Sequence, residues 1–187
     1  MVADDLGTNI HSLTGHSALI DEVARLVAST FIYGIVVILG LVWVHRDGLR
    51  VVAAFALGLV IALGIGAVLG KIWAEPRPFV ADHFVPLIAH GTDSSFPSDH
   101  LIVLGAIVGA CLISARRLAM VGVALALLVA VARVYVGVHY PIDVVAGFML
   151  GLVCAVTVWS VLGKAQSGLD MIDSTLSGWR VRPQRLR

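Results

Sequence analysis

Residues 96–143 read FPSDHLIVLGAIVGACLISARRLAMVGVALALLVAVARVYVGVHYPID. Two apolar runs, 101–115 and 118–132, lie between a polar motif at each end and are separated by Arg116-Arg117. Each run is shorter than the roughly 20 residues that a membrane-spanning helix needs. Extending the runs to 98–115 and 118–135 makes them adequate. The polar motifs are therefore expected to form the outer turns of two membrane helices.

The rest of the chain has the composition of a membrane protein. Of its 187 residues 59% are hydrophobic and only 13% are charged, whereas a soluble domain is about a quarter charged. Three more runs without acidic or basic side chains are long enough to span: 26–44, 51–70 and 144–163. The sequence predicts an all-α integral membrane protein, a single domain with about five transmembrane helices, and a tail at 164–187.

Residues 1–25 are predicted to form an amphipathic segment at the outer interface. Apolar residues recur at helical spacing from Ala18 to Leu26, and the charged Asp21, Glu22 and Arg25 alternate with them. For residues 1–10 a frayed polar terminus is an equally good interpretation.

Lysine and arginine are distributed unequally between the two sides that alternating spans define. One side has the 45–50 loop, the Arg116-Arg117 turn and the tail. Its basic residues are Arg46, Arg50, Arg116, Arg117, Lys164, Arg180, Arg182, Arg185 and Arg187. The other side has Arg25, Lys71, Arg77 and Arg133. By the positive-inside rule the first side is cytoplasmic, so the polar motifs face outward and the C-terminus lies in the cytoplasm.

Charge at a membrane boundary is functional by default, and the first constellation is Lys71 with Arg77-Pro78. Pro76 and Pro78 prevent a regular helix around Arg77. An extended arginine can present its planar fork to phosphate oxygens, and Lys71 can add a point charge. The alternative is a pair of cations that reach to the interface from a helix end.

The second constellation is Ser98-Asp99-His100, immediately before an apolar run. Ser98 is placed as a helix N-cap, and the free N–H groups after it would form an anion site that His100 faces. The alternative is a simple cap beside an interfacial histidine.

The third constellation is Arg133, His139 and Asp143, around a Pro141 suited to the first turn of a helix. An aspartate that accepts a hydrogen bond from one imidazole nitrogen leaves the other nitrogen as a nucleophile. The alternative is a salt-linked loop between two helices.

Together the three constellations resemble the signatures of the type 2 phosphatidic acid phosphatase superfamily, Lys-x6-Arg-Pro, Pro-Ser-Gly-His and Ser-Arg-x5-His-x3-Asp. The form Phe-Pro-Ser-Asp-His and the short chain resemble the bacitracin-resistance type of undecaprenyl diphosphatase within it. Three positions depart from the signatures. Lys71 is one residue too close to Arg77, Asp99 replaces a glycine, and Ala132 replaces a serine. Asp99 could tune His100 or repel a second anion.

The resemblance implies a helical bundle with its active site at the outer face and a bacterial plasma-membrane location. It implies that His139 attacks phosphorus to give a phosphohistidine, that Asp143 orients it, and that His100 is the general acid and base. Phosphate-binding roles are implied for Lys71, Arg77, Ser98, Arg133. No metal or cofactor is expected, because the chain has no acidic cluster with magnesium spacing.

The implied reaction is hydrolysis of a polyprenyl diphosphate to the monophosphate. A phosphatidylglycerophosphate or phosphatidic acid phosphatase is the alternative enzyme. An anion-binding or transport protein is an alternative of another class, and a purely structural membrane protein would leave the outer charges unexplained. The expected partners are the lipid phosphate substrate and membrane lipid, and no nucleic acid. The sequence sets no oligomeric state.

The other outward histidines, His11, His16, His83 and His90, have no motif partner. They are interpreted as surface polar groups. For His83 and His90 a place beside the mouth of the site is the alternative to plain loop packing.

Overall fold

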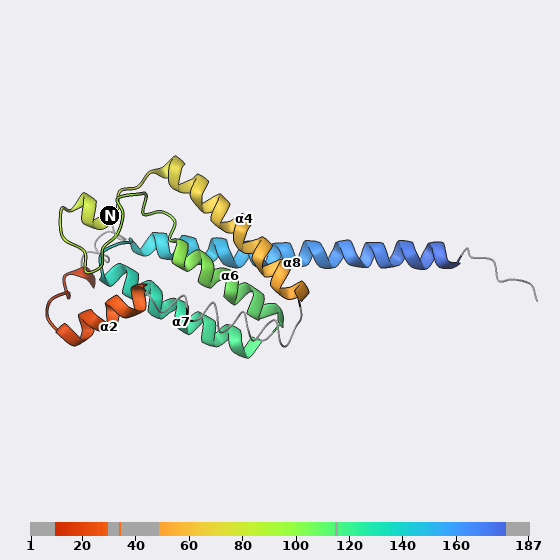
Figure 1. The fold of residues 1–187 in the computed structure, drawn as a ribbon, viewed down its shortest axis with the longest axis horizontal. Helices are drawn as coiled ribbons and strands as arrows, with labels where there is room; N and C mark the ends of the chain where they lie inside the picture. The colour runs from red at the N-terminus through yellow and green to blue at the C-terminus, as the bar shows by residue number, and fades with distance from the viewer. Residues whose placement is uncertain (1–9, 30–33, 35–48, 115, 179–187) are drawn as a thin grey trace, which may run out of the picture.

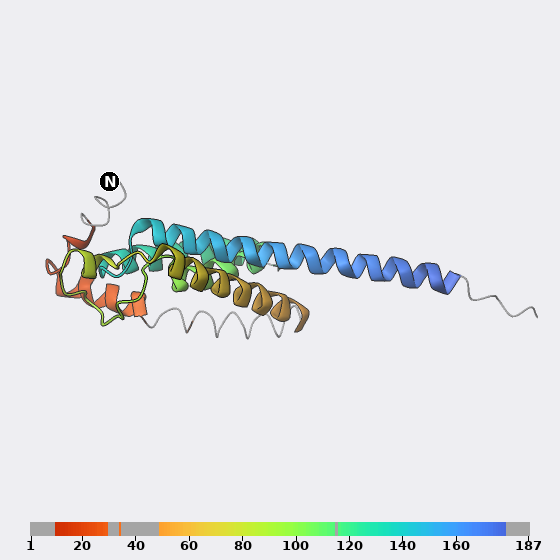
Figure 2. The same cartoon turned by 90° about the horizontal axis from the view of Figure 1, so that it is seen from above.

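The structure is a computed structural model, and it describes residues 10–29, 34, 49–114 and 116–178. Its helices are α2 (Ala18–Ser29), α4 (Leu49–Trp73), α5 (Pro78–Ala81), α6 (Asp99–Ser114), α7 (Arg116–Tyr135) and α8 (Pro141–Gly178). These ranges contain no strand, and the predicted all-α class is confirmed. Figures 1 and 2 show α4, α6, α7 and α8 side by side as a bundle, with α2 beside one end of α7.

Four of the five predicted spans correspond to helices of this bundle. Three apolar stretches are long enough to cross a membrane: Val52–Ala81, which begins in α4, Arg116–Tyr135 and Pro141–Leu162. Helix α6 is apolar but has only 16 residues, because the polar loop before it ends at Ser98. The predicted span 26–44 lies outside the described residues apart from 26–29 and 34.

The last helix is longer than its predicted span of 144–163. Helix α8 has 38 residues and continues through Gly178, so the first part of the predicted 164–187 tail is helical. Residues 179–187 lie outside the described chain. The helix continues because residues 164–178 contain no proline and have helix-compatible side chains up to the glycine at its end.

Helix α6 is the centre of the bundle and packs against α4, α7 and α8. Leu101, Ile102 and Leu104 on it are fully buried. Its closest neighbour is α8, and the backbones approach closely at Gly105 and Gly151. A Cβ atom added to Gly151 would lie 1.9 Å from the Ile102 carbonyl oxygen. This contact is the small-residue packing that brings membrane helices together.

Helix α2 has the amphipathic character that the sequence predicts. Its exposed apolar residues are Leu19, Ile20, Val23 and Leu26, while Ala24, Val27 and Ala28 are buried. Asp21 is also buried, facing α7, where it accepts a hydrogen bond from the Tyr135 hydroxyl at 2.7 Å. This carboxylate therefore fixes the helix to the bundle and does not join Glu22 and Arg25 at the surface.

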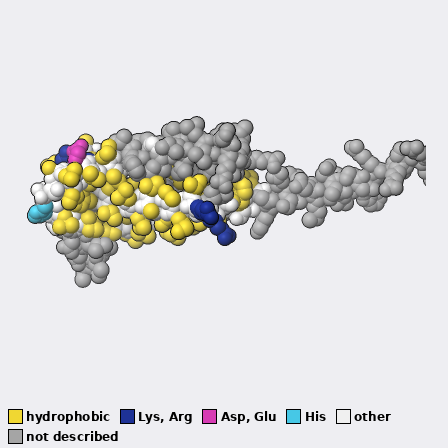
Figure 3. Space-filling model, turned by 90° about the horizontal axis from the view of Figure 1, so that it is seen from below, with side chains coloured by type: hydrophobic (Ala, Val, Ile, Leu, Met, Phe, Trp, Pro, Cys, Tyr) yellow, Lys and Arg dark blue, Asp and Glu magenta, His cyan; other side chains and the backbone are white. Residues whose placement is uncertain are grey.

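The outer surface of the bundle is apolar along its length. Figure 3 shows hydrophobic side chains over the described helices on that face, while acidic and histidine side chains lie at one end and basic side chains at both ends. Many of the exposed side chains are large and apolar, such as Val60 and Leu127. Lipid is the solvent that such a surface needs, and the chain is a membrane protein.

Candidate active site

Arg77 is placed by the break between α4 and α5. Its backbone is extended, with φ −63° and ψ 152°, and Pro78 begins the short helix α5 directly after it. The predicted interruption of the helix by the prolines is thus observed. The buried guanidinium donates from Nη1 to the Val138 carbonyl oxygen at 3.0 Å. This bond joins the segment before α5 to the segment between α7 and α8, and it holds the Arg77 guanidinium group in place.

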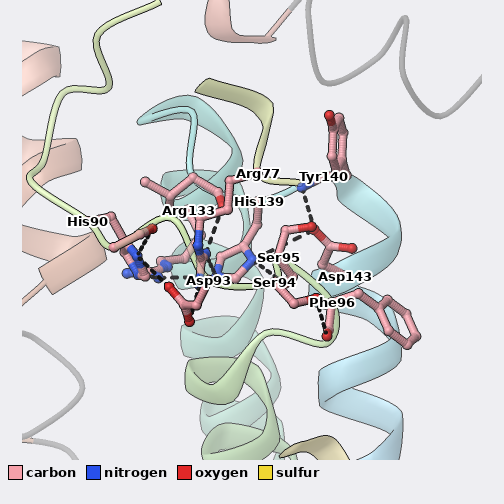
Figure 4. Close-up of polar contacts among 12 residues, drawn as sticks. Arg77, His90, Asp93, Ser94, Ser95, Phe96, Arg133, His139, Tyr140 and Asp143 are labelled. Atoms are coloured by element: carbon pink, nitrogen blue, oxygen red, sulfur yellow. Dashed lines mark hydrogen bonds and ion pairs between the residues drawn. The ribbon is translucent and has the colours of Figure 1, made fainter. Parts of the chain in front are cut away.

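Arg133 reaches the same place from the last turn of α7. Its side chain is buried and donates from Nη1 to the Ala28 carbonyl oxygen of α2 at 3.0 Å. Its Nη2 lies 3.1 Å from His139 Nε2, and Arg77 Nη1 lies 3.5 Å from the same nitrogen. Figure 4 shows the two arginines and His139 pointing toward one another.

The protonation of His139 follows from its contacts. Its Nδ1 lies 2.8 Å from the Ser95 carbonyl oxygen, which can only accept, so Nδ1 carries the proton. Nε2 is then the nitrogen with the lone pair, and it accepts from Arg133. Burial, together with the guanidinium groups of Arg133 and Arg77, lowers the pKa of His139 well below its ordinary value. The imidazole is therefore held neutral, in the tautomer a nucleophile needs.

Asp143 lies behind the histidine, in the first turn of α8. Its Oδ2 is 3.7 Å from His139 Nδ1, which is too long for a hydrogen bond, and it accepts from the Tyr140 N–H at 2.8 Å. In this state the Ser95 carbonyl makes the contact that the sequence assigns to Asp143. Asp143 thus fixes the turn that carries the ring, through its bond from the Tyr140 N–H.

Ser98 is the residue before α6, as expected of an N-cap, but its hydroxyl does not cap. Its carbonyl accepts from the N–H groups of Leu101 and Ile102, and its own N–H donates to the Asp143 carbonyl at 3.1 Å. The Oγ atom is buried without a hydrogen-bond partner among the described residues. Ser98 therefore joins α6 to α8 and stands behind the wall of the cavity described next.

A cavity of about 890 Å³ brings most of the predicted site residues together. Its wall includes the predicted residues Lys71, Arg77, Asp99, His100, Arg133 and His139. The same wall continues along α4 over Leu63, Gly66 and Ala67. Ser98 and Asp143 are buried beside it and do not line it. One end of the cavity is thus cationic and the other is apolar.

Two residues of the cavity wall contact the arginines, although no role was assigned to them from the sequence. His90 Nε2 lies 3.0 Å from Arg133 Nη2, and Asp93 Oδ2 accepts from Arg77 Nη2 at 3.1 Å. The interpretation of His90 as a plain surface group is therefore wrong, and its place beside the mouth of the site holds. His83 is exposed outside this cavity. No sequence spacing relates His90 and Asp93 to the arginines, because these residues become neighbours only when the chain folds.

The ionisation of these two residues follows from the arginines. Burial lowers the pKa of His90, and the charges of Arg77 and Arg133 lower it further. Neutral His90 can accept from Arg133 through Nε2 and donate from Nδ1 toward the Gly91 carbonyl oxygen, 3.3 Å away. For Asp93 partial burial raises the pKa, but the Arg77 hydrogen bond and charge outweigh it, so the carboxyl pKa lies below its usual value.

The polar groups of the site do not form a metal site. No cluster of three histidine, cysteine or acidic side chains with metal-binding geometry occurs within the described ranges. Two arginines and a lysine line the cavity instead. Guanidinium and ammonium groups can stabilise the charge of a transferring phosphoryl group.

The sequence profile of the PAP2 superfamily matches residues 49–167, which is more than half of the chain and includes all three motifs. The chain belongs to the PAP2 superfamily. Undecaprenyl-diphosphatase BcrC of Bacillus subtilis is 32% identical over 147 residues, covering 77% of this chain and 76% of that protein. A Bacillus licheniformis protein named bacitracin transport permease protein BcrC is 29% identical over 181 residues, covering 95% and 87%.

Solved PAP2 structures share the fold. The PAP2-type phosphatidylglycerolphosphate phosphatase from Bacillus subtilis has a TM-score of 0.62 at 26% identity, covering 87% of this chain and 85% of that one. LpxE from Aquifex aeolicus has a TM-score of 0.63 at 20% identity, covering 83% and 93%, and it supports the fold alone. The predicted superfamily and its membrane helical bundle are thus confirmed.

Proposed function

We propose that this PAP2 protein hydrolyses undecaprenyl diphosphate, or a related polyprenyl diphosphate, to the monophosphate and inorganic phosphate. The observation that carries the proposal is His139, whose Nε2 lone pair stands between Arg77 and Arg133 in the wall of a cavity. The similarity to an undecaprenyl-diphosphatase supports this choice of substrate. The reaction would return the lipid carrier to cell-wall synthesis.

The first step is transfer of the terminal phosphoryl group to His139. Phosphoryl oxygens take over the N–H donors of Arg77 and Arg133, which frees the Nε2 lone pair that Arg133 occupies in this structure. The Nε2–P bond forms as the bond from phosphorus to the bridging oxygen breaks. His100, on the same cavity wall and protonated once the anionic substrate is bound, gives its proton to that oxygen, and the lipid monophosphate leaves.

The second step is hydrolysis of the phosphohistidine. Neutral His100 accepts a proton from a water molecule, the water oxygen bonds to phosphorus, and the P–Nε2 bond breaks. His139 and His100 return to their starting states, and inorganic phosphate is released. Throughout, the Ser95 carbonyl and the nearby Asp143 carboxylate keep the Nδ1 proton in place and favour the charge that develops on the ring.

The shape of the cavity supports a lipid substrate. Its apolar end is lined by Leu63, Gly66 and Ala67 of α4, a helix that is long and apolar enough to cross the membrane. An isoprenoid tail can lie there while the diphosphate reaches the arginines. Lys71, near the end of α4 on the same wall, would bind the inner phosphate as a point charge that needs no fixed geometry.

The deciding experiment measures phosphate release in detergent with EDTA, from undecaprenyl diphosphate and from phosphatidylglycerophosphate. We expect a higher kcat/KM for the diphosphate. His139→Gln and His100→Gln should each lower kcat by at least about 10³-fold, because one removes the nucleophile and the other the proton donor. The control is His16→Gln, an exposed histidine away from the cavity, which should keep wild-type activity.

The intermediate offers a second readout. Rapid alkaline quenching with substrate labelled at the terminal phosphate should trap label on the wild-type protein and none on His139→Gln. Preference for phosphatidylglycerophosphate would favour the alternative phosphatase. Phosphate movement into liposomes without hydrolysis would favour a transporter, the class that the name of one relative suggests.

We also propose that the cavity faces the outside of the bacterial plasma membrane and that the C-terminus is cytoplasmic. The support is the excess of lysine and arginine at the opposite end of the spans, including Arg116 and Arg117 at the start of α7. A cysteine at exposed Asp82 should react with an impermeant maleimide in intact cells. A cysteine at exposed Arg117 should react only after the cells are opened.

A further inference from the structure

Two residues of one loop each contact one arginine of the site. Asp93 Oδ2 accepts from Arg77 Nη2 at 3.1 Å, and His90 Nε2 lies 3.0 Å from Arg133 Nη2. The two loop residues also face each other, with Asp93 Oδ1 3.9 Å from His90 Nδ1. Through the two arginines both loop residues are linked to His139 Nε2, the nitrogen that the proposed reaction uses, and Figure 4 shows these side chains together.

The two halves of the Arg77–Asp93 pair differ in how firmly they are held. The Arg77 side chain is 5% exposed and is fixed by its bond to the Val138 carbonyl, whereas the Asp93 side chain is 71% exposed. Arg77 is thus fixed by the buried groups around it, whereas the exposed Asp93 side chain is held mainly by its ion pair with Arg77. A competing anion can displace the carboxylate, because it offers Arg77 the same kind of acceptor oxygens while the exposed Asp93 side chain becomes solvated by water.

A carboxylate and a phosphoryl group offer an arginine the same kind of acceptor, two oxygens on one centre. Asp93 lines the same cavity as His139, Arg77 and Arg133, and its carboxylate occupies the Arg77 Nη2 donor that a phosphoryl oxygen would use. Asp82 is an acidic residue nearby in the chain that lines a smaller cavity, which also reaches His139 but is lined by neither Arg77 nor Arg133. Asp93 and Asp82 carry the same charge, but only Asp93 contacts one of the two arginines in the described structure.

We propose that Asp93 is a built-in competitor for the phosphate site, which holds Arg77 between turnovers, yields to the phosphoryl group, and returns to hasten the release of inorganic phosphate. The inference rests on the proposed function in taking the His139 cavity as a phosphate site. Release matters because a free phosphate ion between two buried arginines would otherwise leave slowly, and the enzyme would be inhibited by its own product.

The direct test is the affinity for inorganic phosphate, measured by calorimetry on the full-length protein in detergent. Asp93→Asn removes the competing charge from an exposed position and leaves the anchored Arg77 in place. Phosphate should bind the variant about three- to tenfold more tightly than the wild type. Asp93→Glu keeps a carboxylate and should restore an affinity close to wild type. Asp82→Asn removes the same charge from the neighbouring surface and should leave the affinity unchanged.

Steady-state kinetics provides the second readout. The turnover rate of Asp93→Asn should fall as phosphate accumulates, and added phosphate should inhibit this variant more strongly than the wild type. Equal phosphate affinity in Asp93→Asn and wild type would overturn the inference alone, and so would equal tightening in Asp82→Asn. Weaker binding by Asp93→Asn would overturn it too, since Asp93 would then be positioning Arg77. A wild-type protein that binds no phosphate would overturn the proposed function as well.

Discussion

Arg133 Nη1 donates to the Ala28 carbonyl oxygen at 3.0 Å, so the last turn of α2 is joined directly to the proposed phosphate site. The same guanidinium contacts His90 and His139 through Nη2. One planar group thus links the N-terminal helix, the 82–98 loop and the proposed nucleophile. Such a link requires the rigid fork of arginine, because donors on a lysine radiate from a single nitrogen.

Arg133→Lys should therefore abolish most activity although it keeps the charge. We expect kcat/KM to fall about 100-fold, the effect of losing one positioned donor from a reacting phosphoryl group. Loss of the Ala28 bond should also destabilise the fold by about 1–3 kcal/mol. Phosphate release and thermal unfolding measure the two effects. Arg25→Lys, at an exposed position on α2, is the control, and comparable activity in both variants would contradict the role of the fork.

The attachment of α2 also depends on the buried pair Asp21 and Tyr135, whose oxygens are 2.7 Å apart. We expect Asp21→Ala and Tyr135→Phe to destabilise the protein by about 1–3 kcal/mol each, because each removes a buried hydrogen bond to a carboxylate. The remaining partner keeps one contact, since the Tyr135 hydroxyl can donate to the Leu13 carbonyl oxygen at 3.2 Å and Asp21 still accepts from the Gly15 N–H at 3.1 Å. The double variant should lose about 1–2 kcal/mol less than the sum of the single losses. All three should show reduced activity through the Ala28–Arg133 contact. Additive losses, measured by chemical unfolding, would show that the two side chains are not coupled.

The sequence predicts the helices and the motif residues of the site because local physical constraints determine both. Apolar length identifies the spans, and Pro76 and Pro78 place Arg77 in an extended segment. Arg133 and His139 come together because α7 ends and α8 begins within a few residues. These residues lie close to one another in the sequence, so their spacing alone predicts that they come together.

The contacts made by the loop are of another kind. His90 and Ser95 are 43 and 44 residues away from Arg133 and His139, and the bonds between them depend on how the loop folds over the helix ends. Asp143 shows the same limit. Its spacing from His139 correctly predicts proximity, while the nearer hydrogen-bond acceptor is a backbone carbonyl, which no side-chain pattern can reveal.

Close packing of α6 on α8 should make Gly151 sensitive to the smallest substitution. A Cβ atom there would lie 1.9 Å from the Ile102 carbonyl oxygen, so Gly151→Ala must push the helices apart. We expect a destabilisation of about 1–3 kcal/mol, and reduced activity, since α6 carries His100 and α8 carries Asp143. Gly64→Ala is the control, because nothing lies within 4 Å of a Cβ at that position of α4. The two variants are compared by thermal unfolding and phosphate release, and equal stabilities would contradict the close contact.

His139 should stay neutral, with its proton on Nδ1, at pH values where an ordinary histidine is protonated. Burial and the charges of Arg133 and Arg77 lower its pKa well below the ordinary 6.5, and the Ser95 carbonyl fixes the tautomer. The unfolded chain binds this proton near pH 6.5 and the folded chain does not, so His139 contributes a loss of stability as the pH falls below 6.5.

Nitrogen NMR of labelled histidine at about pH 6, assigned by the signal missing in His139→Gln, should show the neutral Nδ1–H form. Added phosphate should raise the pKa by offsetting the two guanidinium charges. A His139 signal that titrates near 6.5 and ignores phosphate would mean that the arginines do not act on this nitrogen.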